Sequence, residues 1–291
     1  MTDYDPLEHL PVIPLGHSGT KTFFYFVRST RQVVPLTPGS HSERTLLSMA
    51  ELADWELYYR TGSSGAIDWS EVGGSLMAHC RSVGIYDPFL TRGRGAWSDG
   101  KDIVFHAGST LFVNGVTTPF EKYTDTKFRY VATPRIMCPA ENGTTTQDSK
   151  DLLSALQTFG WEHPELSPLL ILGWIGCSLI CGAIEWRPHL WITGPKGCGK
   201  STLDGLVCGI LGDLALHIQG STTEAGLRQS LNGDSRPILF DEFEADGKHA
   251  DAVIDTARSA ASNNAAPVVK GTPEGNPVYY KLQFAAMFSG I

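Results

Sequence analysis

The chain has 291 residues, of which 42% are hydrophobic and 19% are charged. This length and composition predict a globular protein of about two domains and exclude a wholly disordered, fibrous or collagen-like chain. The chain carries 23 Lys and Arg residues against 31 Asp and Glu residues, a formal net charge of −8. A protein that coats nucleic acid through a generally basic surface is therefore excluded, whereas a ring that lines only its channel with cations is compatible with this charge.

The first half of the chain mixes strands and helices without a visible repeat. The expected elements are a β-hairpin at 21–27 and 32–36, helices at 42–55 and 68–84, and strands at 102–108, 110–116 and 127–133. The dipeptides Asp99-Gly100 and Asn114-Gly115 are typical of tight turns between strands. These elements predict an α+β domain over residues 1–140.

Residues 141–187 are predicted to be a linker followed by helices that pack on the next domain. The uncharged run at 166–184 approaches the length of a transmembrane helix, but glycines and cysteines dilute it, so we expect a buried core helix and no membrane association. The six cysteines show no zinc-ligand spacing, and the first residues do not form a signal peptide. Reduced thiols and a cytoplasmic location are expected.

Strands and helices alternate over the remaining residues, 188–291. Strands are expected at 189–193, 214–218, 237–241, 266–271 and 279–289, and helices at 202–212, 223–231 and 248–262. This alternation predicts an α/β domain with a parallel sheet covered on both faces.

A glycine-rich segment at residues 194–201 matches the pattern GxxxxGK[ST], which binds nucleotide phosphates. Its glycines let several backbone N–H groups point at phosphate oxygens, and the following helix adds its dipole. Lys200 is expected to neutralise the β- and γ-phosphates of ATP, and the Ser201 hydroxyl to bind Mg²⁺. The flanking apolar strand and helix favour this interpretation over a glycine-rich surface turn. The residues predicted to contact ATP are Gly194, Pro195, Lys196, Gly197, Cys198, Gly199, Lys200, Ser201 and Thr202.

A second motif is the apolar strand at 237–241, which ends in Asp241 and is followed by Glu242. At the strand tip Asp241 can hold the Mg²⁺ shell, and Glu242 can orient or deprotonate an attacking water. Many strands end at charged loops, but this one follows the glycine-rich segment after one strand and one helix. The pair predicts hydrolysis rather than phosphoryl transfer to an acceptor.

Two places offer candidate contacts to single-stranded DNA. A hairpin is expected at 268–281, with Lys270 and Lys281 flanking its tip, where lysine can contact a nucleic-acid backbone. Arg92 and Arg94 lie among glycines beside Trp97, a composition suited to a single-strand contact. The alternatives are an ordinary hairpin with solvated lysines and a glycine bulge with exposed arginines.

Several stretches together resemble the helicase portion of phage and prophage primase–helicase proteins, which are AAA+ motors akin to superfamily III helicases. They are RGRGAWSDGKDIVFHAG, ICGAIEWRPHLWITGPKGCGKST, STTEAGLRQSL, ILFDEFEAD and VVKGTPEGNPVYYKLQFAAMFSGI. The resemblance covers most of the chain. It implies an α/β fold in which a P-loop ATPase core of the AAA+/ASCE type at 188–291 follows the α+β domain. It also implies a ring of identical subunits, usually a hexamer, that hydrolyses ATP with Mg²⁺ while moving on DNA.

The same resemblance assigns roles to individual residues. Lys200 and Ser201 match the Walker A pair, and Asp241 and Glu242 match the Walker B pair. Ser289 falls where such motors place a polar sensor, at the end of the strand beside the P-loop strand. The hairpin at 268–281 looks like the pre-sensor insertion that contacts DNA in superfamily III.

The sequence departs from this family in two respects. It shows no primase signature, so a primase is expected as a partner or as another domain. It ends soon after Ser289, where such motors usually continue with a strand and an arginine finger, so the core is expected to be truncated. Arg258 is the leading candidate for an arginine that acts on a neighbouring subunit, and a solvated or locally paired arginine is the alternative.

The expected function is that of an ATP-dependent DNA helicase or translocase in phage or mobile-element replication, in the cytoplasm of a bacterial host. One alternative is an AAA+ ATPase that remodels protein partners in defence or assembly, which the negative net charge favours. The other is a nucleotide-binding fragment without turnover, because a chain without its arginine finger can bind a nucleotide that it does not hydrolyse.

Overall fold

A computed structural model describes residues 10–19, 21–59, 65–244, 249–264, 268–271 and 277–290. Its contacts divide the chain into an N-terminal unit, Met1–Thr91 with Arg129–Ala132, and a C-terminal unit, Arg92–Phe128 with Thr133–Ile291. The domain boundary expected near residue 140 therefore lies near residue 91, and most of the second group of strands belongs to the C-terminal unit. None of the helices in the described ranges combines the length and the hydrophobicity that a transmembrane helix needs.

The N-terminal unit is an antiparallel sheet covered by helices. Its strands β1 (Val12–Ser18), β2 (Thr22–Val27) and β3 (Gln32–Leu36) pair in sequence order, which confirms the predicted hairpin. The helix expected at 42–55 is divided into α1 (Glu43–Met49) and α2 (Leu52–Glu56), because Ala50 is extended and Glu51 caps a new helix. The second predicted helix is α3 (Trp69–Val83).

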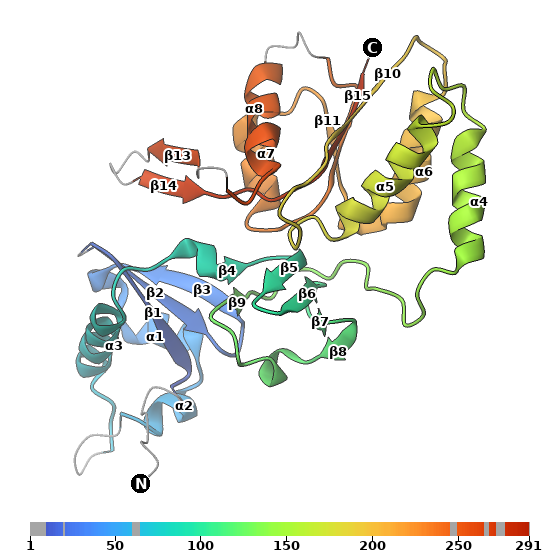
Figure 1. The fold of residues 1–291 in the computed structure, drawn as a ribbon. Coiled ribbons are helices and arrows are strands. Elements are labelled where there is room, and N and C mark those ends of the chain that lie inside the picture. Colours follow the sequence, from blue (N-terminus) through green and yellow to red (C-terminus); the bar gives the residue numbers. More distant parts are fainter. Residues whose placement is uncertain are drawn as a thin grey trace. The chain divides into compact units, whose positions relative to one another are not determined.

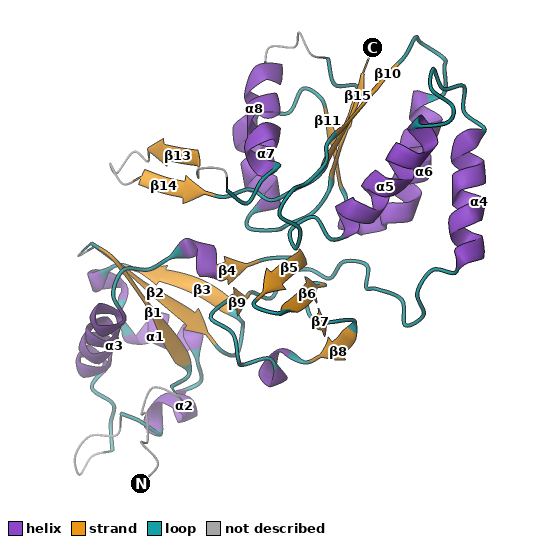
Figure 2. Cartoon of the chain, in the orientation of Figure 1, coloured by secondary structure: helices purple, strands orange, loops and turns teal. Residues whose placement is uncertain are grey.

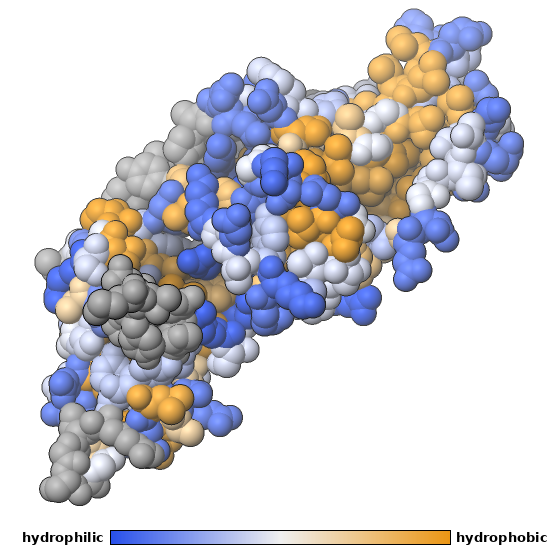
Figure 3. Space-filling model, turned by 60° about the horizontal axis from the view of Figure 1, so that its bottom comes forward, coloured by the Kyte–Doolittle hydropathy of each residue, from blue (hydrophilic) through white to orange (hydrophobic). Residues whose placement is uncertain are grey.

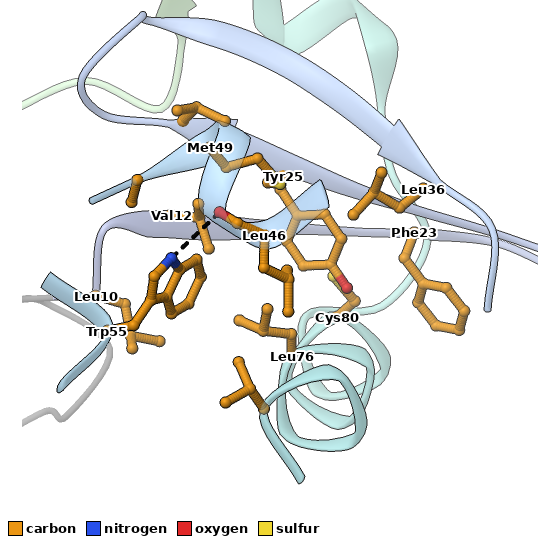
Figure 4. Close-up of a cluster of buried hydrophobic side chains, with 13 residues drawn as sticks. Leu10, Val12, Phe23, Tyr25, Leu36, Leu46, Met49, Trp55, Leu76 and Cys80 are labelled. Carbon is orange, nitrogen blue, oxygen red and sulfur yellow. Dashed lines mark hydrogen bonds between the residues drawn. The ribbon is translucent and has the colours of Figure 1, made fainter. Parts of the chain in front are cut away.

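The core of this unit lies between the sheet and the three helices (Figure 4). Tyr25 of β2, Leu46 of α1 and Leu76 of α3 are fully buried in it. The buried Trp55 donates a hydrogen bond from Nε1 to the carbonyl oxygen of Leu46 at 3.2 Å. This bond satisfies the one polar atom of a large apolar side chain, as buried tryptophans usually require.

The C-terminal unit begins with an antiparallel meander. Its strands β5 (Gly95–Asp99), β6 (Asp102–His106), β7 (Leu111–Val113) and β8 (Val116–Thr118) pair in sequence order. The Asn-Gly turn has positive φ at both Asn114 and Gly115, the backbone conformation that two-residue hairpins favour. The strand expected at 127–133 is reduced to β9 (Arg129–Tyr130), which pairs with β4 (Thr91–Arg92). Short 3-10 helices occur at Pro38–Ser40, Pro88–Leu90, Phe120–Lys122 and Gly212–Leu214.

A four-stranded parallel sheet follows, with strand order β10-β15-β12-β11. The strands are β10 (Leu190–Thr193), β11 (Leu216–Gln219), β12 (Ile238–Asp241) and β15 (Ala286–Gly290). Helices α4 (Thr146–Gln157), α5 (Ser167–Leu179) and α6 (Lys200–Leu211) cover one face. Helices α7 (Glu224–Leu231) and α8 (Ala250–Ala260) cover the other (Figures 1 and 2). The predicted parallel sheet with two covered faces is confirmed.

Alternation along the strands decides which side chains meet which helices. Leu239 of β12 and Met287 of β15 point to the face covered by α6. The next residues, Phe240 and Phe288, point to the face covered by α7 and α8, and their rings stack with centroids 4.6 Å apart. The helix expected from the uncharged run is α5, which buries Trp174 and two isoleucines against this core.

Apolar side chains also reach the surface of the C-terminal unit. Leu169 and Leu170 of α5 are about half exposed, and Trp186 is 69% exposed. Figure 3 shows hydrophobic patches among hydrophilic residues on one face of the molecule. The prediction of a buried core helix at 166–184 therefore holds for one side of α5 only.

Candidate functional site

The segment at 194–201, called the glycine loop below, joins the end of β10 to the start of α6. Gly197 and Gly199 have φ values of 83° and 101°, in the region that favours glycine. Gly199 is the N-cap of α6 and has no side chain that could bond the first N–H groups of the helix. Those N–H groups, together with the positive end of the helix dipole, therefore stay available to an anion at the loop.

Lys200 is the first residue of α6, and its ammonium lies back against the glycine loop. Its Nζ donates hydrogen bonds to the carbonyl oxygen of Gly194 and, at 3.2 Å, to that of Pro195. Ser201 and Thr202, the next two residues of the motif, are exposed. Backbone carbonyl oxygens therefore hold the Lys200 ammonium at the glycine loop.

The acidic motif lies at the same edge of the sheet as the glycine loop. All four strands are parallel, so their carboxyl ends share one edge. Ile192 of β10 pairs with Ser289 of β15, and Phe240 of β12 pairs with Phe288. The order β10-β15-β12 therefore separates Asp241 from the end of β10 by two strand spacings, about 10 Å. The prediction that the last strand lies beside the strand of the glycine loop is confirmed, and Ser289 is buried there.

Glu242 follows Asp241 in an unusual backbone conformation, with φ of 52°. Positive φ is uncommon for a residue with a side chain and often marks a functional turn. Hydrogen bonds hold the turn on both sides: the Gly220 N–H donates to the Asp241 carbonyl, and the Phe243 N–H donates to the Ser289 carbonyl, each at 2.7 Å. The Glu242 side chain is exposed at this edge.

Asp204 is a residue of this site that the sequence reasoning missed. It lies on the buried face of α6, one turn after Lys200, and is only 8% exposed. Neither carboxylate oxygen has a hydrogen bond of ordinary geometry, although the Ser289 hydroxyl is close enough to favour the charged form. Burial raises the pKa of Asp204, and the Asp241 carboxylate raises it further, whereas Ser289, His217 and Lys200 offset part of the rise. The one signal in the sequence is an acidic residue on the apolar face of the helix after the loop.

A cavity of about 280 Å³ lies beside the glycine loop. Cys198, Gly199 and Lys200 line it together with β10, α5 and the segment between α4 and α5. That segment contributes Phe159 and Trp161, whose ring centroids are 6.0 Å apart. A small cavity with aromatic walls and a few polar groups has the character of ligand pockets in proteins. Sequence reasoning missed this segment because it carries no motif.

The structure contradicts the idea that Arg92 and Arg94 are presented to DNA. Arg92 is only 9% exposed, and its guanidinium lies over the rings of Trp97 and Phe128. Arg94 forms an ion pair with the buried carboxylate of Asp234 at 2.7 Å. The glycines beside them let two backbone segments pack closely together and do not form a free loop. A Cβ on Gly95, for example, would collide with the backbone of Ser235. Both cations are used inside the C-terminal unit.

The hairpin expected at 268–281 forms, with β13 (Val268–Gly271) antiparallel to β14 (Pro277–Tyr280). Val268 pairs with Tyr280 at its base, so Lys281 follows the base and does not flank the tip. Lys270 pairs with Val278 one step from the end of the described ladder. The tip predicted to contact DNA, at 272–276, lies outside the described residues.

Arg258 lies at the C-terminal end of α8, where its Nη1 is 2.9 Å from an Asp255 carboxylate oxygen. Both side chains are more than 70% exposed, which matches the locally paired alternative. The residue after this helix, Ala261, accepts a hydrogen bond from the Arg187 N–H just before β10 begins. The end of α8 is therefore near the amino edge of the sheet, opposite the glycine loop, and Arg258 is not part of the site of its own chain.

No family model and no curated protein matches the sequence. Among solved structures, the fold is similar to the apo structure of the NrS-1 C terminal region (305-718), with 13% identity and a TM-score of 0.42. The match covers 99% of this chain and 57% of that one, so the chain spans little more than half the length of the matched structure. A similarity of this degree does not assign the chain to a family.

Proposed function

We propose that the C-terminal unit is a P-loop ATPase core, and that the chain is a subunit of an ATP-dependent DNA helicase or translocase of phage or mobile-element replication. One observation carries the ATPase part of this proposal. The glycine loop and the Asp241-Glu242 pair lie at the same carboxyl edge of a parallel sheet, with Ser289 on the strand between them. Ligands of open α/β sheets bind at this edge.

The residues at this edge fit ATP with Mg²⁺. The loop amides and Lys200 would bind the phosphates, and the Ser201 hydroxyl and Asp241 would hold the cation. The buried and only partly compensated carboxylate of Asp204 beside Asp241 is independent support for a cation, because such a charge requires compensation. Bound Mg²⁺ would neutralise charge on the phosphate oxygens. Among the described residues, no group of three or more His, Cys, Asp or Glu side chains could hold a metal ion by itself.

The chain's own residues would perform the hydrolytic step. The exposed Glu242 carboxylate would orient the attacking water and accept its proton, while Lys200 holds the charge that builds on the γ-phosphate. Ser289, buried on the strand between the two motifs, would contact the phosphate or the water as a polar sensor. The cavity beside the glycine loop would take the base, with Phe159 and Trp161 as its aromatic walls.

The action on DNA rests on the resemblance of the sequence to superfamily III motors and on the β13-β14 hairpin. In a hexameric ring, this hairpin would project into the channel, and Lys270 would contact the backbone of single-stranded DNA. An arginine of the neighbouring subunit, for which Arg258 is the candidate, would complete the ATP site. A primase is the expected partner in replication.

A second candidate function is an AAA+ ATPase that acts on protein. The net charge of −8 favours it, and so does the use of Arg92 and Arg94 inside the fold, which removes two of the four cations assigned to DNA. A nucleotide-binding fragment without turnover is a third candidate.

The test is ATP turnover by the full chain with and without single-stranded DNA, together with binding of a fluorescent ATP analogue and the mass in solution. We expect DNA to stimulate turnover and the mass to rise with ATP and DNA. Lys200→Ala should abolish nucleotide binding. Lys270→Ala should weaken DNA binding and reduce the slope of log affinity against log salt concentration by about 1. The control Lys150→Ala, which changes a lysine on the outside of α4, should alter neither quantity. Turnover without DNA stimulation and without salt-sensitive DNA binding would favour the protein-remodelling candidate.

A further inference from the structure

The buried Asp204 carboxylate lies close to the residues that would hold the cation. Asp204 is one turn beyond Ser201 and Lys200 on α6, and residues three and four apart lie on the same side of a helix. The other buried residues of α6 are Leu203, Val207 and Leu211, which pack on the sheet. The carboxylate of Asp204 is therefore directed at the sheet and not at solvent.

Strand alternation identifies what Asp204 faces. Leu239 and Met287 contact the α6 side of the sheet, so the side chains two positions further along, Asp241 and Ser289, point to the same side. Asp241 is the last residue of β12 and Ser289 is the last but one of β15, so both lie near the glycine-loop edge. Asp204 and Asp241 thus present two carboxylates to one place, with the Ser289 hydroxyl between the strands.

The chain's own cations compensate this pair only in part, because Lys200 and His217 lower the pKa of Asp204 while burial and the Asp241 carboxylate raise it. Both oxygens of Asp204 lack a hydrogen bond of ordinary geometry, and the nearby Lys200 ammonium donates to Gly194 and Pro195 instead. A buried carboxylate without full compensation strongly destabilises a fold, so its presence at a ligand-binding edge indicates a charge that arrives with the ligand. Two carboxylates and two hydroxyls, those of Ser201 and Ser289, are the oxygen donors that a hydrated divalent cation accepts.

We propose that Asp204 is a second carboxylate of the divalent-cation site, where it accepts hydrogen bonds from waters of the ion that Ser201 and Asp241 hold. This inference rests on the proposed ATPase site and adds a residue that the Walker pattern does not contain. The site then holds the hydrated cation before the nucleotide arrives, because two carboxylates provide enough charge without phosphate oxygens.

The test is a titration of the full chain with Mn²⁺ in the absence of nucleotide. Binding is measured by electron paramagnetic resonance as the decrease in the signal of free Mn²⁺. The wild-type chain should bind a single Mn²⁺ saturably. Asp204→Asn should weaken this binding by roughly 10- to 100-fold, the usual effect of removing a group that holds a metal's outer shell. Asp251→Asn, an exposed carboxylate on α8, should leave it unchanged. Wild-type affinity in Asp204→Asn, or no saturable binding by the wild type, overturns the proposal.

Thermal unfolding in EDTA separates a cation-binding role from a structural one. Asn has the shape of Asp without its charge, so Asp204→Asn should raise the melting temperature in EDTA while it weakens Mn²⁺ binding. A lower melting temperature with unchanged Mn²⁺ affinity would show that the carboxylate serves the fold and would overturn the proposal. Asp204→Ala provides the same comparison if the Asn variant does not fold. Binding of the fluorescent ATP analogue separates a failure of this inference from a failure of the proposed ATPase site. If the analogue binds and Asp204→Asn has the Mn²⁺ affinity of the wild type, only the role of Asp204 is wrong.

Discussion

Asp234 binds Arg94 through both carboxylate oxygens: Oδ1 accepts the Arg94 backbone N–H at 2.7 Å, and Oδ2 accepts Nε at 2.9 Å and lies 2.7 Å from Nη2. The Arg236 guanidinium lies 3.5 Å from the same Oδ2, and both Asp234 and Arg236 are buried. The Gly93 N–H also donates to the Gly233 carbonyl at 3.0 Å. The turn after α7 is thereby fixed to the segment that leads into β5.

We expect Asp234→Ala to lower the free energy of unfolding of the C-terminal unit by about 3 to 5 kcal/mol, because it leaves two arginines without their carboxylate. The measurement is urea denaturation of the full chain followed by tryptophan fluorescence. Asp255→Ala removes the partner of Arg258 in an exposed pair and should change stability by no more than about 0.5 kcal/mol. Equal effects of the two substitutions would contradict the importance of burial here.

The Arg94–Asp234 contact also shows why part of the fold escaped sequence analysis. The two residues are 140 positions apart, and periodicity or turn signals report only on neighbours within one element. Glycines and arginines beside a tryptophan suit a nucleic-acid contact and a tight packing site equally well. The domain boundary was misplaced for the same reason, since contacts with the turn after α7 tie the meander to the C-terminal unit.

The parallel sheet and the two motifs could be predicted because their signals are local. An apolar strand followed by a glycine loop and an amphipathic helix is visible in about twenty consecutive residues. The position of β15 beside β10 came from the family resemblance, not from the residues themselves. Asp204 was missed because a single acidic residue in a helix usually faces solvent, and only the three-dimensional packing shows that this one does not.

The strained conformation of Glu242 predicts opposite effects on stability and activity. Its φ of 52° disfavours a residue with a side chain, whereas glycine adopts this conformation readily. Glu242→Gly should therefore raise the free energy of unfolding by about 1 kcal/mol and abolish ATP hydrolysis. Glu242→Gln should abolish hydrolysis while it keeps ATP binding and the wild-type stability. Chemical denaturation and a phosphate-release assay measure the two effects.

Near-normal turnover of Glu242→Gln would show that another group activates the water. The neighbouring Glu244, which is also exposed, is the control, since Glu244→Gln should leave turnover and stability unchanged. If Glu242→Gly destabilises the chain, the positive φ is not a source of strain.

Gly290 is required because the turn that carries Glu242 passes directly over it. A Cβ at Gly290 would lie 2.2 Å from the carbonyl oxygen of Phe243, a separation that no relaxed structure allows. Gly290→Ala should therefore lower stability by roughly 1 to 3 kcal/mol and reduce turnover, because the turn must move away from the sheet edge.

Gly209 lies on the exposed side of α6, and a Cβ there meets nothing within 4 Å. Gly209→Ala should instead stabilise the chain by up to about 1 kcal/mol. Similar losses in both variants, measured by thermal unfolding, would contradict this explanation.

His189 predicts a loss of stability at acidic pH. Its Nδ1 accepts the Ala286 N–H at 2.9 Å, so its Nε2 carries the proton and donates to the Ala257 carbonyl at 2.8 Å. Burial lowers the pKa of His189, and the nearby Arg187 lowers it further. Between this lowered pKa and the value of about 6.5 in the unfolded chain, the unfolded state binds more protons than the folded state. Stability contributed by neutral His189 is thus complete above about pH 6.5 and is lost as the pH falls through that window.

We expect His189→Gln to reduce the slope of unfolding free energy against pH between about 7 and 5, as measured by urea denaturation at several pH values. Glutamine can replace one donor and one acceptor but does not titrate. The slope should decrease without vanishing, because burial also lowers the pKa of His41 in the N-terminal unit. A slope unaffected by His189→Gln would contradict this prediction, because protonation of Nδ1 removes the lone pair that accepts the Ala286 N–H and should therefore cost stability.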